Sequence, residues 1–170
     1  MTRAIAFVGM GSNLVHPRRQ LARAARRLAR LPRTRLVALS RNYVTAPLGT
    51  TAAQPDYVNA VAMLATALSP RALLARLMAL ERRQGRRRDA RTPRNAPRSL
   101  DLDLLLYGRL RLVTPTLTLP HPRMHERAFV LRPLFDVAPA ATIPGRGLAR
   151  KMLAGVRSQR IARTRTHHMH

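Results

Sequence analysis

The order of its periodic apolar segments is the feature that most restricts the fold of this chain. Extended or alternating apolar patterns predict strands over residues 4–10, 35–45, 57–67 and 99–107. Leucine and alanine recur at helical spacing over 17–31 and 69–84, where Ser69 is the expected capping residue and Pro70 the first helical residue. The order β-α-β-β-α-β predicts an α+β sandwich of the ferredoxin-like kind, with a mainly antiparallel sheet and helices on its faces.

The rest of the chain is interpreted as the end of one domain followed by a tail. We expect a short hairpin over 110–119, a helix over 123–135 and a last helix near 147–157. Gly85 should end the second helix, and residues 86–98, which lack large apolar side chains, should form a mobile surface loop. Since no repeat or linker is visible, residues 1–158 are predicted to form a single domain, and the basic, histidine-containing residues 159–170 a disordered tail without a role.

Arginine dominates the charge of the chain, with 32 Lys+Arg residues against 7 Asp+Glu residues and a formal net charge of +25. Such a surface attracts polyanions, so a nucleic-acid-binding protein is one interpretation. The arginines of residues 18–30 fall where a helix would meet solvent, which favours a solvated helix face. Because no RNA-binding aromatic signature accompanies them, we expect no specific nucleic-acid partner.

Composition also limits the compartment and the kinds of metal site. The chain has no cysteine, so it can form neither a disulfide framework nor a thiolate metal site. No apolar run approaches the roughly 20 residues that cross a bilayer, and the first residues lack the pattern of an export signal. We expect a cytoplasmic protein without a membrane partner.

Asp101 and Asp103 are two of the few acidic residues and lie in the predicted strand 99–107. Because side chains alternate along a strand, both carboxylates should share one face, opposite Leu100, Leu102, Leu104 and Leu106. Their Cβ atoms should lie about 6–7 Å apart, a span that hard cations bridge. Magnesium beside the arginines of 86–98 would suit phosphoryl transfer. The alternative is the solvated face of an amphipathic strand, with the acids paired to arginine.

A second group of residues could bind a flat, polar ligand. His121 lies between two prolines, so a rigid turn would hold its imidazole. Tyr57 and Asn59 should share one face of a strand, and Phe129 is another of the few aromatic residues. An aromatic pair can sandwich a heterocycle while an amide contacts its edge. A surface histidine and aromatic residues packed in the core are the alternatives, and neither a dinucleotide fingerprint nor a P-loop is present.

Short motifs follow one another in a fixed order between residues 4 and 147. They include Gly11-Ser12-Asn13-Leu14, Thr45-Ala46-Pro47-Leu48-Gly49, Gln54-Pro55-Asp56-Tyr57-Val58-Asn59 and Leu119-Pro120-His121. The most specific stretch runs from Arg94 through Ala96-Pro97-Arg98 to Asp101-Leu102-Asp103. This ordered set resembles the 6-hydroxymethyl-7,8-dihydropterin pyrophosphokinases of folate biosynthesis, which transfer pyrophosphate from ATP to the pterin alcohol and release AMP.

The resemblance implies a role for each candidate residue. Asp101 and Asp103 would bind two magnesium ions that bridge the phosphates of ATP, the co-substrate. The pterin would contact Thr45, Ala46, Pro47, Leu48, Tyr57, Asn59 and Phe129. ATP would contact Glu81, Arg88, Arg98, Leu104, Thr118, His121 and Arg127. Arg86, Arg98 and His121 would act in catalysis, and the loop 86–98 would close over both substrates and exclude water.

Departures from the family pattern occur at Asn95, where the family usually carries tryptophan in a shorter loop, and at Thr116, which replaces an arginine that often contacts phosphate. These changes affect the expected rate and ATP affinity more than the reaction type. They leave a catalytically weakened pterin- or nucleotide-binding relative as an alternative, beside the basic nucleic-acid-binding protein. We expect the active enzyme to be a monomer.

Overall fold

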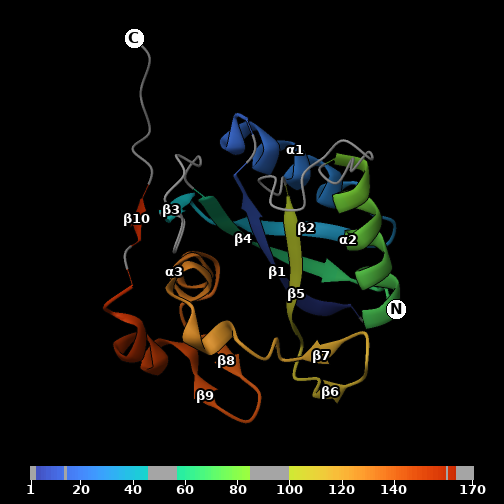
Figure 1. Ribbon diagram of the computed structural model, residues 1–170. Helices are drawn as coiled ribbons and strands as arrows, with labels where there is room; N and C mark the ends of the chain where they lie inside the picture. Colours follow the sequence, from blue (N-terminus) through green and yellow to red (C-terminus); the bar gives the residue numbers. More distant parts are fainter. Residues whose placement is uncertain (1–2, 14, 46–56, 85–99, 160, 164–170) are drawn as a thin grey trace.

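A six-stranded antiparallel sheet lies between layers of helices in the computed structural model (Figure 1). The structure describes residues 3–13, 15–45, 57–84, 100–159 and 161–163. The strands of the sheet are β1 (Ala4–Ser12), β2 (Thr34–Leu39), β3 (Tyr43–Thr45), β4 (Tyr57–Thr66), β5 (Asp101–Tyr107) and β10 (Ala162–Arg163). They follow the order β10-β3-β4-β1-β5, and β2 also pairs with β4. This order, with β1 and β4 in the centre, confirms the predicted ferredoxin-like α+β fold.

The helices divide between the faces of the sheet. One face is covered by α1 (Pro17–Ala29) and α2 (Pro70–Gln84), and the other by α3 (Ala128–Val137) with the 3-10 helices η1 (Met124–Glu126) and η2 (Ala149–Val156). The core is split accordingly: Val8 and Leu64 pack in the cluster under α1 and α2, and Phe7 and Val61 in the cluster under α3. The hairpins are β6 (Leu112–Val113) with β7 (Thr118–Leu119), as predicted, and β8 (Thr142–Ile143) with β9 (Gly147–Leu148).

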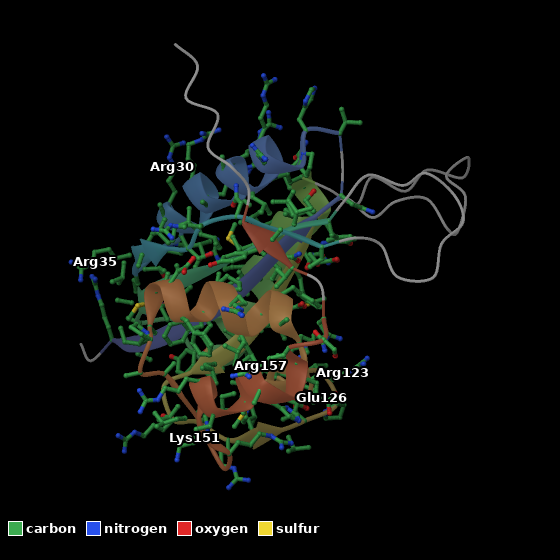
Figure 2. All side chains as sticks on the ribbon, turned by 90° about the vertical axis from the view of Figure 1, so that its left-hand side faces the viewer. Arg30, Arg35, Arg123, Glu126, Lys151 and Arg157 are labelled. Atoms are coloured by element: carbon green, nitrogen blue, oxygen red, sulfur yellow. The ribbon has the colours of Figure 1, made fainter. Side chains whose placement is uncertain are left out.

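Helices α1 and α2 form where the leucine and alanine spacing predicts them. Leu21 and Leu28 of α1 are buried, whereas Arg18, Arg19, Arg23 and Arg26 of the same helix are exposed. Arg30, just after α1, and Arg35 on β2 also extend into solvent (Figure 2). The expected solvated arginine face is therefore present on α1. Ser69 Oγ accepts a hydrogen bond from the Ala72 N–H at 3.2 Å, as expected of a capping residue. None of the described helices is both long and apolar enough to cross a bilayer.

The strand predicted over 35–45 is interrupted at Ser40. The Ser40 N–H donates to the Val61 carbonyl at 2.9 Å, but the Val61 N–H donates to Ser40 Oγ at 2.8 Å. A side chain thus replaces one backbone acceptor, and the pairing resumes only at β3. A hydroxyl that competes with the strand ladder in this way is characteristic of serine.

The helices predicted near the C-terminus are shorter and tighter than expected. The helix predicted over 123–135 is divided, because Arg127 is extended (φ −121°, ψ 112°) between η1 and α3. The last predicted helix, near 147–157, is the 3-10 helix η2, and its first predicted residues belong to β9.

The expectation of a disordered tail is wrong for its described part. Ala162 and Arg163 pair with Val44 and Tyr43 of β3, and Ile161 packs against the cluster under α3. The pairing covers an edge of the sheet that would otherwise expose backbone hydrogen-bonding groups. The predicted helix end at Gly85, the loop 86–98 and residues 164–170 lie outside the described residues.

Candidate active site

The face of the sheet beside α3 carries a row of polar side chains at the end of β1. Gly11 of β1 lies opposite Asn59 of β4 on one side and Asp101 of β5 on the other, so all three share this face. Gly9 lies opposite Asp103 in the same way. A Cβ atom on Gly11 would lie 3.1 Å from Asn59 Oδ1, so glycine allows the amide to lie over β1.

The carboxylate pair lies as the alternation predicts. Asp101 is half-buried and Asp103 is exposed, whereas Leu102 between them is buried under α2. In the described part of the chain, no group of three or more histidine or acidic residues could hold a metal. A carboxylate pair is nevertheless a sufficient protein ligand set for Mg²⁺, which keeps several waters and binds substrate phosphates.

The prediction for Leu106 is wrong. Leu100, Leu102 and Leu104 belong to the cluster under α1 and α2, but Leu105 and Leu106 both belong to the cluster under α3. The register shifts between Phe7 and Val8, so that Leu105 is an extra residue in β5. Such a bulge reverses the alternation of the residues beyond it.

Tyr57 and Asn59 share one face of β4, as predicted, and the pairing of β4 and β5 with β1 places them on the same face as the carboxylates. The Tyr57 hydroxyl donates a hydrogen bond to Asp101 Oδ2 at 3.0 Å. Asn59 Nδ2 donates to Thr45 Oγ1 at 3.0 Å, and Asn59 is only 6% exposed. The structure therefore brings an aromatic ring, a buried amide and a carboxylate together.

His121 lies beside β5, where the backbone N–H of His121 donates to the Leu105 carbonyl at 2.9 Å. Burial lowers the pKa of the imidazole below its ordinary value of 6.5; the charge of Asp103 raises this pKa, and those of Arg127 and Arg123 lower it. The Arg123 N–H donates to His121 Nδ1 at 3.3 Å, so the proton of the neutral ring is assigned to Nε2. His121 is thus a neutral hydrogen-bond donor near Asp103.

Arg127 and Phe129 form a pair at the start of α3. The guanidinium carbon of Arg127 lies 5.4 Å from the centre of the Phe129 ring, a cation–π distance. Phe129 is half-buried and packs against the cluster under α3. An aromatic surface and a cation therefore lie together on the α3 side of the sheet.

Glu81 lies on the opposite side of the sheet from the carboxylate pair. It is 9% exposed, and its Oε1 accepts a hydrogen bond from the Leu102 N–H at 2.6 Å. Leu102 separates Asp101 from Asp103 in β5, which is an edge strand. Glu81 therefore holds the backbone of the metal-ligand candidates, a contact that the sequence pattern does not reveal.

Gln159 contacts the start of α3 from the predicted tail. Its Nε2 donates to the Glu126 carbonyl at 2.7 Å, and its Oε1 accepts from the Ala128 N–H at 2.8 Å. These bonds bracket Arg127. No local pattern in the sequence marks Gln159, because its partners lie about thirty residues away.

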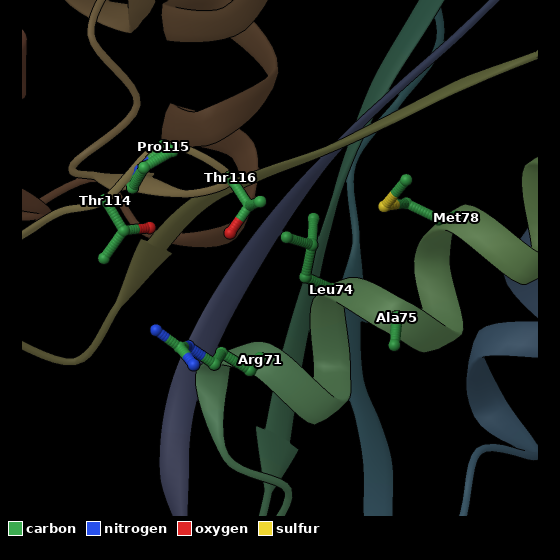
Figure 3. Close-up of a pocket in the computed structure, with 7 residues that line it drawn as sticks. All are labelled: Arg71, Leu74, Ala75, Met78, Thr114, Pro115 and Thr116. Atoms are coloured by element: carbon green, nitrogen blue, oxygen red, sulfur yellow. The ribbon is translucent and has the colours of Figure 1, made fainter.

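A cavity of about 390 Å³ lies between α2 and the turn of the β6–β7 hairpin (Figure 3). Its lining consists of Arg71, Leu74, Ala75, Met78, Thr114, Pro115 and Thr116. Leu74, Met78 and Glu81 follow one another at helical spacing, so they lie along one side of α2. The same side of α2 therefore lines the cavity with Leu74 and Met78 and contacts β5, the strand of the carboxylate pair, through Glu81.

Two of the predicted ATP contacts lie in strands, whereas seven residues named in the sequence analysis lie outside the described residues. Leu104 is buried in β5, and Thr118 is half-buried in β7. The part of the chain that the structure describes does not include Ala46, Pro47, Leu48, Arg86, Arg88, Asn95 and Arg98.

Comparisons with known proteins show the family of the chain. The sequence profile of the 7,8-dihydro-6-hydroxymethylpterin-pyrophosphokinase family matches residues 7–139. A protein of Pseudomonas aeruginosa named 2-amino-4-hydroxy-6-hydroxymethyldihydropteridine pyrophosphokinase is 50% identical over 149 residues, 87% of this chain and 90% of its own. A protein of Haemophilus influenzae with the same name is 45% identical over 139 residues, 82% of this chain and 84% of its own.

Solved structures agree on the fold. A crystal structure titled as HPPK-DHPS in complex with substrates matches 91% of this chain with a TM-score of 0.70 at 12% identity. The wild-type HPPK-DHPS of Plasmodium falciparum with pteroate matches 95% of the chain, with a TM-score of 0.70 at 11% identity. The present chain covers only 43% and 48% of these longer proteins. The profile and the curated relatives show that the chain belongs to the 7,8-dihydro-6-hydroxymethylpterin-pyrophosphokinase family.

Proposed function

We propose that this protein transfers a pyrophosphoryl group from ATP to the hydroxymethyl group of 6-hydroxymethyl-7,8-dihydropterin, as a step of folate biosynthesis. The names of its relatives support this reaction. The observation that carries the proposal is the hydrogen bond from Tyr57 to Asp101, which joins an aromatic surface to a candidate metal ligand. A heterocycle on that ring would present its substituent close to bound phosphates.

Asp101 and Asp103 are the residues that would hold magnesium, and two ions are proposed. Magnesium would neutralise phosphate charge and favour an in-line geometry. The exposed Asp103 leaves room for waters and phosphate oxygens, which Mg²⁺ requires in addition to carboxylates. The hydrogen bond from Tyr57 would orient the Asp101 carboxylate for this role.

The pterin would lie between the rings of Tyr57 and Phe129. Asn59 offers a carbonyl oxygen and an amide group, which together can pair with the donor and acceptor edge of a pterin. Its low exposure and its bond to Thr45 favour a fixed orientation of that amide. Backbone groups of residues 45–48 would complete the contacts with the edge of the ring.

The nucleotide would extend from the cavity beside α2 toward the carboxylate pair. Leu74, Ala75 and Met78 offer an apolar wall for the base, and the cavity volume suits a small ligand. Thr116 lines this cavity, in place of the arginine expected from the family. Leu104 and Thr118 are proposed as further ATP contacts on the neighbouring strands.

In the proposed reaction, the pterin hydroxyl oxygen bonds to the β-phosphorus, and the bond between that phosphorus and the α,β-bridging oxygen breaks. AMP leaves with that oxygen, and the hydroxyl proton passes to a phosphate oxygen of the products and then to solvent. The neutral His121 would donate from Nε2 to a phosphate oxygen, and Arg127 would add positive charge. Arg86, Arg88 and Arg98 are proposed to bind phosphates from the loop 86–98, which would exclude water. A monomeric state and a cytoplasmic location stay predictions.

The proposal can be tested by replacing a candidate metal ligand. Asp103→Asn should reduce AMP formation at least about 100-fold, because a lost metal ligand costs more than a lost outer-shell partner. Asp136→Asn is the matched control, because Asp136 is also an exposed carboxylate but lies near the C-terminal end of α3, where it accepts hydrogen bonds from the Tyr43 hydroxyl and the Arg41 backbone N–H. Equal activity of the two variants would contradict the metal assignment.

Pterin stacking has a separate test. Tyr57→Ala should weaken binding of the pterin more than binding of ATP, whereas equal losses would indicate that Tyr57 is only a core residue. Pterin binding without any AMP formation would favour the weakened-relative alternative.

A further inference from the structure

The segment that follows η2 contacts elements on either side of the candidate pterin pocket. At the α3 side, Gln159 bonds to the Glu126 carbonyl and the Ala128 N–H. These groups flank Arg127, whose guanidinium lies over the ring of Phe129. Arg127 itself is extended and has no side-chain cap, so the amide of Gln159 takes the place of a helix cap for α3.

Further along the chain, the same segment forms strand β10 at the edge of the sheet. Ala162 pairs with Val44 and Arg163 pairs with Tyr43, so β10 covers the outer edge of β3. The other edge of β3 pairs with β4, where Thr45 lies opposite Tyr57 and Tyr43 lies opposite Asn59. β3 is only three residues long, and pairing on both edges restrains it far more than pairing on one.

Between these contacts, the side chain of Ile161 packs against the cluster under α3. The backbone N–H of Gln159 donates to the Val156 carbonyl of η2 at 3.0 Å. The segment is thus attached to η2, to the start of α3 and to the edge of β3. These elements carry Phe129 on one side and Thr45, with its partner Asn59, on the other.

We propose that Gln159 and residues 161–163 position the pterin pocket by fixing the start of α3 and strand β3 relative to each other. The inference rests on the proposed pterin-binding function. Gln159 is a positioning residue, because it acts through Arg127 and Phe129 and not through contact with the substrate. Arg127 is only one of several proposed phosphate contacts, and the nucleotide cavity lies across the sheet, beside α2; the segment should therefore affect pterin affinity much more than nucleotide affinity.

The test uses the full chain with Gln159→Leu, which is similar in size but has neither polar group. We expect the Kd for 6-hydroxymethyl-7,8-dihydropterin to rise about five- to tenfold, as for the loss of a hydrogen bond or two, measured with a non-hydrolysable ATP analogue and magnesium present. The Kd of the analogue itself should stay within about twofold. Gln159→Glu should recover part of the loss, because its carboxylate can still accept from the Ala128 N–H.

Thr34→Val is the control for a general loss of stability. It also removes side-chain hydrogen bonds, to Thr66 and Pro32, but at the opposite end of β4 from Tyr57. We expect it to lower the melting temperature without a change in pterin affinity. An unchanged pterin Kd in Gln159→Leu, or equal losses for both ligands, would overturn the proposal.

A second pair of variants addresses the strand. Ala162→Pro should interrupt β10 and weaken pterin binding, whereas Ala162→Thr keeps a strand-compatible residue and should bind as the wild type does. Equal pterin affinity of these variants would contradict a role for β10. If the wild-type chain binds no pterin, the proposed function fails; if it binds pterin and Gln159→Leu binds equally well, only the present inference fails.

Discussion

Glu81 offers a sharp test of how the carboxylate pair is held. Its carboxylate is buried and accepts the hydrogen bond from the Leu102 N–H at 2.6 Å. We predict that Glu81→Leu destabilises the fold and weakens magnesium binding together. The physical reason is that β5 is an edge strand among the described residues, so no described strand pairs with its outer side and could accept from the Leu102 N–H.

The expected loss of stability follows from removing one buried hydrogen bond, that between the Leu102 N–H and the Glu81 carboxylate. Such a bond contributes about 1.5–3 kcal/mol, and the same range applies when its donor is left without a partner. For a chain of this size, 1 kcal/mol corresponds to about 2–4 °C, so we expect the melting temperature of Glu81→Leu to fall by about 3–12 °C. Glu81→Gln keeps an oxygen acceptor and should lose about half as much.

The assay pairs thermal unfolding with calorimetric titration of Mg²⁺ in the presence of a non-hydrolysable ATP analogue. Glu81→Leu should raise the Kd for magnesium about 10- to 100-fold, the usual effect of a lost outer-shell partner. Glu81→Gln should restore most of the affinity. If Glu81 only contacts the nucleotide, the melting temperature of Glu81→Leu will be unchanged and metal-free nucleotide binding will be lost, which would refute the positioning role.

Two further predictions concern the polar row. In the metal-free protein, an NMR titration should give His121 a pKa below 6.5, and Asp103→Asn should lower it further because the Asp103 charge raises it; a rise would contradict their proximity. Because the folded pKa is depressed, the contribution of His121 to stability is complete above pH 6.5 and is lost as the pH falls toward the folded value. Gly11→Ala should weaken pterin binding by displacing Asn59, whereas Gly9→Ala, whose nearest contact is 3.4 Å, should not; equal effects would refute this reading.

The elements and the polar row could be predicted because they depend on local patterns. Alternation along β4 and β5 places Tyr57 with Asn59 and Asp101 with Asp103, and the register of β1 then brings these pairs together. The fold class followed from the order of the elements. The hydrogen bond between Tyr57 and Asp101 required the structure, because it depends on which strands are neighbours.

The features that the sequence could not reveal depend on distant partners. The extra residue Leu105 shifts the alternation only because β1 lies beside it, and Ser40 interrupts its strand only because its hydroxyl reaches β4. The sequence gives no sign that Glu81 differs from other helix residues, because its hydrogen bond from the Leu102 N–H joins α2 to a strand 21 residues away. Gln159 lies in a polar, basic segment whose composition indicates disorder, yet its amide completes α3.

The most direct measurement of the central claim is the product analysis of a reaction containing the protein, ATP, magnesium and 6-hydroxymethyl-7,8-dihydropterin. The proposed reaction predicts AMP and the pterin diphosphate in equal amounts, with no AMP when either the pterin or magnesium is omitted. Formation of ADP or free phosphate in place of AMP, or tight pterin binding without any product, would contradict it.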